Sequence, residues 1–119
     1  MDFDFTEEQK MIRNVAREFA RKEIAPAAEY YDRNSEFPHE IHSKARKLGL
    51  INVVIPEEYG GSGLSAIEMI LVTEELAWGC AGIAVSGIAI NTLTAQPILL
   101  AGDNEQKKKY LGILSEGFG

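Results

Sequence analysis

The sequence has no charged side chain between Glu75 and Asp103, and this uncharged stretch limits what the chain can fold into. About 20 apolar residues suffice to span a bilayer, so a membrane segment has to be considered. The stretch also contains a proline and several polar side chains: Ser86, Asn91, Thr92, Thr94, Gln96 and Pro97. We therefore favour a helix inside protein over a membrane span. Residues 81–95 are apolar on nearly every side and are expected to be buried on nearly every side.

Three capping boxes, at residues 6–9, 65–68 and 103–106, mark further helix starts. Apolar residues recur behind each of them at helical spacing. Residues 51–55 are apolar and partly β-branched, and we interpret them as an extended buried segment. Such runs are too few to build a sheet. The sequence therefore predicts an all-α fold, an orthogonal bundle of five to six helices.

Prolines and polar segments predict where these helices end. Pro26 is expected to kink or end the first helix, and the polar residues 32–35 are expected to form a loop. Pro38 suits the first turn of a second helix, which Gly49 ends. Pro97 is expected to restart a short helix.

Composition excludes several classes of protein. The chain has 119 residues, 18 acidic against 12 basic, and a net charge of −6, which argues against nucleic-acid binding. Cys80 is the only cysteine, so neither an intramolecular disulfide nor a Cys-rich zinc site can form. The acidic N-terminus lacks the pattern of a secretory signal, and we expect a soluble cytoplasmic protein of one domain.

Several residue groups could carry chemistry, but each has a more ordinary interpretation that we favour. Gly60–Gly63 precedes a helix and could bind phosphate, yet its spacing fits no phosphate-binding motif, so we expect a connecting loop. His39 and His42 could share a metal, but we expect surface histidines and no metal site. Lys107–Lys109 is expected to be a solvated face, with Tyr110 turned inward. Cys80 is expected to be a small packing residue.

Glu74 and Glu75 are the only carboxylates beside the uncharged stretch. Burial could make one of them a general base. Consecutive helix positions point about 100° apart, so the two are not expected to share a site. We assign no catalytic residue.

The order of these elements resembles the N-terminal helical domain of the acyl-CoA dehydrogenases, especially the medium- and short-chain members. The resemblance runs over nearly the whole of residues 1–119 and rests on six segments in the family's order. They are Phe5-Thr6-Glu7-Glu8-Gln9, Glu23-Ile24-Ala25-Pro26-Ala27-Ala28, Leu48-Gly49-Leu50 with Ile55-Pro56-Glu57-Glu58-Tyr59-Gly60-Gly61, Glu74-Glu75-Leu76-Ala77, Cys80-Ala81-Gly82, and Asp103 to Leu111.

The resemblance implies an oxidoreductase of fatty acid β-oxidation. Such a flavoprotein oxidises an acyl-CoA thioester to the enoyl-CoA: a glutamate removes the α-proton and FAD takes the β-hydride. The electrons usually pass to an electron-transfer flavoprotein, and the family enzymes are normally homo-oligomers. The family's middle β domain and C-terminal helical domain, with the flavin motif and the catalytic glutamate, are not found in this sequence. We therefore expect residues 1–119 alone to bind no FAD and to be inactive.

The resemblance also implies where the acyl chain lies. Asn91-Thr92-Leu93 matches the family's Asn-Ser-Leu element, whose leucine approaches the acyl chain. Ser86, Ala89 and Ile90 precede Leu93 by seven, four and three residues, and a helix would place them on the same face. These four residues are the predicted acyl pocket, and one side of their helix is expected to face the absent domains. The alternatives are a stand-alone helical interaction domain or one part of a split dehydrogenase.

Overall fold

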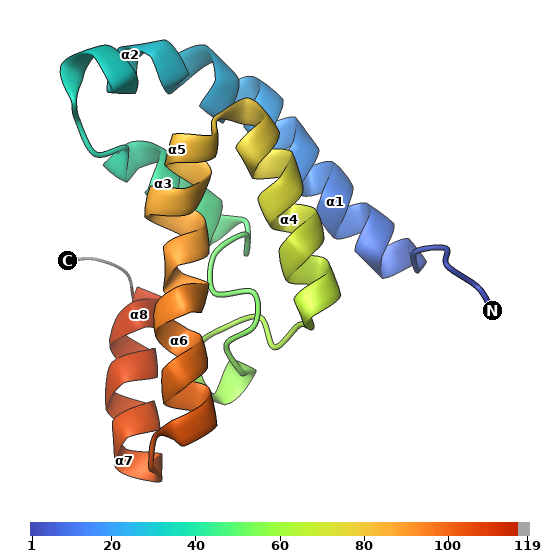
Figure 1. The fold of residues 1–119 in the computed structure, drawn as a ribbon, viewed down its shortest axis with the longest axis vertical. Coiled ribbons are helices and arrows are strands. Elements are labelled where there is room, and N and C mark those ends of the chain that lie inside the picture. The colour runs from blue at the N-terminus through green and yellow to red at the C-terminus, as the bar shows by residue number, and fades with distance from the viewer. Residues whose placement is uncertain (117–119) are drawn as a thin grey trace.

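The computed structural model describes residues 1–116, apart from the side chains at positions 87 and 89–91, and every regular element in that range is helical. Several element boundaries are only a change of helix type, so in the described range the elements join into five longer helices and the separate short turn at residues 57–59 (Figure 1). The predicted all-α fold is confirmed. In chain order the elements are α1 (Glu7–Phe19), the π turn η1 (Ala20–Ile24), the 3-10 turn η2 (Ala25–Ala27), α2 (Ala28–Asn34), α3 (His39–Lys47), the 3-10 turn η3 (Glu57–Tyr59), α4 (Ala66–Gly79), α5 (Ala81–Ile83), the π turn η4 (Ala84–Ala89), α6 (Ile90–Ala101), α7 (Asn104–Gln106), the π turn η5 (Lys107–Leu111) and α8 (Gly112–Glu116).

All three predicted capping boxes are present. At the start of α1, the Thr6 hydroxyl accepts a hydrogen bond from the Gln9 backbone N–H at 3.1 Å, and the Gln9 side-chain oxygen accepts from the Thr6 N–H at 3.0 Å. The same reciprocal arrangement begins α4 at Ser65 and α7 at Asp103. A cap of this kind contributes about 1 kcal/mol, so these residues fix three helix starts.

Pro26 and Pro97 interrupt their helices to different extents. Pro26 lies in η2, where the helix changes type, but the chain continues as α2 to Asn34. The loop predicted at residues 32–35 is therefore wrong except at Ser35, whose left-handed backbone (φ 51°) ends the helix. The new helix predicted at Pro97 is also wrong, because Pro97 lies inside α6. A proline interrupts only part of the helical hydrogen bonding, and apolar packing on both sides of Pro97 holds α6 in place.

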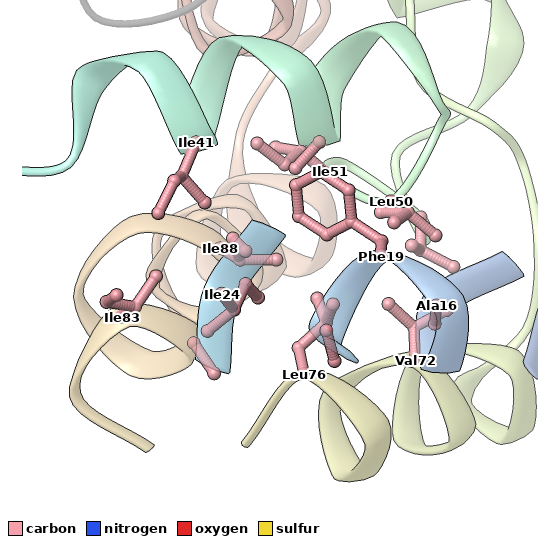
Figure 2. Packing of buried hydrophobic residues seen from close by; sticks show 14 residues of the cluster. Ala16, Phe19, Ile24, Ile41, Leu50, Ile51, Val72, Leu76, Ile83 and Ile88 are labelled. Carbon is pink, nitrogen blue, oxygen red and sulfur yellow. The ribbon is translucent and has the colours of Figure 1, made fainter. Parts of the chain in front are cut away.

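The main core lies where α1, η1 and α4 pack together, with α3 and η4 on one side (Figure 2). Ile24 and Leu76 are fully buried in it. Gly79 lets the end of α4 approach η1, since a Cβ there would lie 3.0 Å from the Ile24 side chain. The buried members are Ala16, Phe19, Ala20, Ile24, Ile41, Ala45, Leu50, Ile51, Val53, Val72, Leu76, Ile83, Ala84 and Ile88.

A smaller cluster of Ile55, Ala95 and Leu111 joins α6 to η5. The segment 51–55 that leads into it is largely buried, as predicted, but it forms bends and turns and is not extended. Asn52 causes this difference: it adopts a left-handed backbone (φ 61°), which asparagine tolerates, and its amide donates to the Leu114 carbonyl at 3.1 Å.

The molecule is flat, with extents of 42 × 41 × 19 Å. A helix with its side chains is about 10–12 Å wide, so the thin direction holds about two layers of helices. Each helix therefore keeps one side at the surface.

The helix of residues 81–101 is covered by α3, α4 and η5 but not all round. The predicted burial of residues 81–95 on nearly every side is wrong at Val85 and Leu93, which are 54% and 71% exposed. The expectation that one side of this helix faces further domains stays a prediction. No helix in residues 1–116 is both long enough and apolar enough to cross a membrane.

Candidate functional site

A groove of about 550 Å³ lies between α4 and the helix of residues 81–101, and we name it the α4–α6 groove. Three of its large apolar side chains, Ile70, Val85 and Leu93, are more than half exposed. The described lining residues are Met69, Ile70, Thr73, Glu74, Val85, Thr92 and Leu93. Solvent-exposed apolar side chains around a concave surface indicate a site for an apolar ligand or for an apolar surface of another protein segment.

The π turn η4 lies in the helix that lines one side of the groove. Seven residues make about two α-helical turns, which is why Ser86 was predicted to share a face with Leu93. A π turn closes i→i+5 hydrogen bonds and takes in about one residue more than an α turn. Val85, eight residues before Leu93, accordingly lines the groove. Ser86 lines a separate hollow beside Tyr31 and donates to the Gly82 carbonyl at 2.6 Å.

The structure thus places the predicted residue Leu93 in the groove and Ser86 outside it. The side chains of Ala89 and Ile90 lie outside the described residues, so their assignment stays a prediction. The acyl-pocket role of all four residues likewise remains a prediction.

Sequence reasoning missed the α4 side of the groove. Ile70 lies in the helix that the capping box at residues 65–68 begins, and its side chain is 58% exposed. A signal was available, because Ile70, Leu71 and Val72 are consecutive and together cover about 200° of the helix. Only Leu71 and Val72 are buried, so the third apolar residue is left for the groove.

The two consecutive glutamates of α4 have different surroundings. Glu74 is exposed and is the only titratable side chain among the described groove residues. Glu75 is instead held by Arg17, whose Nε and Nη2 donate to its two carboxylate oxygens at 3.0 and 2.6 Å. This hydrogen bonding holds the pKa of Glu75 below its usual range. Glu75 does not line the groove. The groove can hold an apolar chain, whereas chemistry on that chain needs groups from elsewhere.

The expectation of two surface histidines is wrong for His42. His39 is exposed, but α3 turns His42 inward, where it is 5% exposed. The Arg46 Nη2 lies 3.3 Å from the His42 Nδ1. Burial, reinforced by the positive charge of Arg46, lowers the pKa of His42 to about 4. Within residues 1–116, no group of three His, Cys, Asp or Glu side chains is placed to hold a metal ion.

The remaining candidates take ordinary structural positions, with one correction. Gly60 and Gly63 have φ values of 91° and 64° and turn the loop between η3 and α4. Cys80 packs against the main core, as predicted. Tyr110, predicted to point inward, is 45% exposed. It lies in the π turn η5 beside Leu111, which is fully buried.

Comparison with known proteins gives a consistent result. Residues 6–117 match the family described as "Acyl-CoA dehydrogenase, N-terminal domain". A Caenorhabditis briggsae protein named probable medium-chain specific acyl-CoA dehydrogenase 2, mitochondrial, is 44% identical over 115 residues, which are 97% of this chain and 28% of that protein.

Two solved structures have the same arrangement of helices. The glutaryl-coenzyme A dehydrogenase–glutaryl-CoA complex matches with a TM-score of 0.85 and 36% identity, over 97% of this chain and 30% of that chain. Acyl-CoA dehydrogenase complexed with FAD from Bacillus anthracis matches with a TM-score of 0.79 and 35% identity, over 94% of this chain and 19% of that chain. The chain therefore spans less than a third of the length of these relatives.

Proposed function

This chain belongs to the acyl-CoA dehydrogenase family as its N-terminal domain, and we propose that its α4–α6 groove forms one wall of the pocket for the substrate's acyl chain. The complete enzyme would convert an acyl-CoA thioester to the enoyl-CoA with FAD as the oxidant. The observation that carries the proposal is the position of Leu93, 71% exposed in an apolar groove of about 550 Å³.

The lining suits the proposed ligand. An acyl chain offers only methylene and methyl groups, and each methylene removed from water contributes about 0.8 kcal/mol. The groove exposes the apolar side chains of Ile70, Val85 and Leu93 to solvent. A bound acyl chain would cover them. The relative solved with glutaryl-CoA supports an acyl-CoA as the substrate class.

The groove does not suit FAD itself. Binding a pyrophosphate calls for backbone N–H groups or cations, and the one charged group among the described groove residues is the carboxylate of Glu74. We therefore propose that the family's middle and C-terminal domains hold the flavin and supply the catalytic base. The Bacillus anthracis relative complexed with FAD supports FAD as the cofactor of the complete enzyme.

Transfer of electrons to an electron-transfer flavoprotein and assembly into a homo-oligomer complete the proposal. The exposed Ile113, which lies outside the groove, supplies apolar surface for such contacts. A stand-alone interaction domain remains the competing function, and it predicts no effect of groove residues on acyl selectivity.

Leu93→Phe tests the proposal in the dehydrogenase that contains this domain. The larger side chain is expected to lower kcat/KM progressively as the acyl chain lengthens. Each methylene kept out of the pocket costs about 0.8 kcal/mol, or about fourfold in kcat/KM. Initial rates with a series of straight-chain acyl-CoA substrates measure this dependence.

Leu100→Phe is the matched control, since Leu100 lies on the same helix, is 83% exposed and does not line the groove. It should leave the chain-length profile unchanged. An equal loss for short and long substrates in Leu93→Phe, or the same profile in both variants, would show that the groove does not hold the acyl chain.

A further inference from the structure

A second cavity, of about 540 Å³, lies between α1, η1 and α4, and we name it the α1–α4 cleft. Arg13, Arg17 and Arg21, four residues apart in sequence, all line it, as does Trp78 of α4. Arg21 belongs to the π turn η1. A π turn takes in more residues than an α turn, and such turns within α-helices often mark functional sites.

The three arginines are not equivalent. Arg17 is occupied by Glu75 through two hydrogen bonds. Arg13 and Arg21 form no ion pair with a described residue. Each guanidinium instead lies over an aromatic ring, with its central carbon 5.6 Å from the ring centroid of Phe5 and of Trp78, respectively. Along this helix, Arg17 forms an ion pair in the middle. The guanidiniums of Arg13 and Arg21 stand at the two ends, and both are close enough to Glu75 to help lower its pKa.

Glu74 adds a negative charge to the middle of this pattern. It is exposed, lines the cleft, and acts electrostatically on Arg17. A compact anion such as phosphate would meet the carboxylates of Glu74 and Glu75 if it lay centrally. If it lay at one end, it would use only Arg13 or only Arg21. The cleft thus favours a ligand with two separated negative groups and a neutral or positive centre.

We infer that the α1–α4 cleft binds an acidic helical segment of a partner protein, with carboxylates at positions i and i+8 and a lysine or arginine at i+4. Eight helical residues span about 12 Å, which is the separation of Arg13 and Arg21 along their own helix. The carboxylates pair with these arginines, and the central cation faces Glu74. Trp78 is 65% exposed, and tryptophan and arginine are the residues that most often dominate binding at protein interfaces.

Trp78 is the only tryptophan of the chain, so its fluorescence reports on the cleft. The test uses the 119-residue chain and an alanine-based helical peptide with Glu, Lys and Glu at i, i+4 and i+8. An isomeric peptide with Glu, Glu and Lys at the same positions has equal composition and charge. We expect saturable binding of the first peptide and binding of the isomer that is weaker by about tenfold or more. Anisotropy of a labelled peptide provides a second readout.

The double variant Arg13→Gln/Arg21→Gln should weaken binding of the first peptide by about tenfold or more. Lys108→Gln, an exposed charge change in η5 outside the cleft, should leave it unchanged. Circular dichroism establishes that both variants keep their helices. Equal affinity for the two peptides would overturn the inference. Undiminished affinity of the double variant, or phosphate displacing the peptide with comparable affinity, would overturn it as well.

Discussion

Lowering the pH from about 7 to about 4 is expected to remove about 3 kcal/mol of stability through His42 alone. An unfolded histidine takes up a proton near pH 6.5, whereas the native His42 has a pKa of about 4. Between these values the unfolded state binds more protons, so stability falls as the pH falls. Well above pH 6.5 the ring is neutral in both states and this loss is absent. The cause is burial, to which the adjacent Arg46 adds.

Urea unfolding at a series of pH values measures this effect, with an unchanged m-value showing that the same surface unfolds. In His42→Gln the slope between pH 6.5 and 4 should largely disappear. Glu75→Gln is the control, because the pKa of Glu75 is lowered and its contribution is lost only below the ordinary carboxyl range. That variant should keep the slope above pH 4.5. Parallel profiles for the wild type and His42→Gln would contradict the assignment.

Gly61→Ala is expected to destabilise the protein by about 3 kcal/mol or more. A Cβ at Gly61 would lie 2.1 Å from the Ile55 carbonyl oxygen and 2.5 Å from the Ile55 Cβ. That carbonyl also accepts from the Gly63 N–H at 2.9 Å, so it cannot rotate away without losing a hydrogen bond. Ile55 is fully buried in the smaller cluster, and relief of the clash would disturb that packing.

Gly112→Ala provides the matched control for the same change of residue. A Cβ at Gly112 meets nothing within 4 Å, and its backbone is already helical. Alanine there should be neutral or stabilising by about 0.5–1 kcal/mol. Chemical unfolding measures the stability of both variants. Similar stabilities for Gly61→Ala and Gly112→Ala would mean that the loop around Gly61 does not pack closely against Ile55.

Features set by neighbouring residues could be predicted from the sequence. The capping boxes at Thr6, Ser65 and Asp103 depend only on a side chain and the backbone three residues on, and all three are present. The family resemblance depends on such local segments in order, and the match over residues 6–117 confirms it.

Features set by helix register and tertiary packing were missed. Val85 lines the groove and Ser86 does not, and both lie in the π turn η4, where no residue type indicates a change of helical period. His42 is buried because α3 packs on the core, although most residues of α3 are polar or charged. The open side of Leu93 follows from the flat packing of the helices, which a pattern of apolar residues does not reveal.

Photo-crosslinking can locate the acyl chain that we propose the α4–α6 groove holds. An acyl-CoA with a diazirine at the end of its acyl chain is bound to the dehydrogenase containing this domain, photolysed, and its adducts are mapped by mass spectrometry. We expect adducts on groove residues such as Met69, Ile70, Val85 and Leu93. Adducts that avoid the groove residues and fall on Leu100 or in the α1–α4 cleft would contradict it.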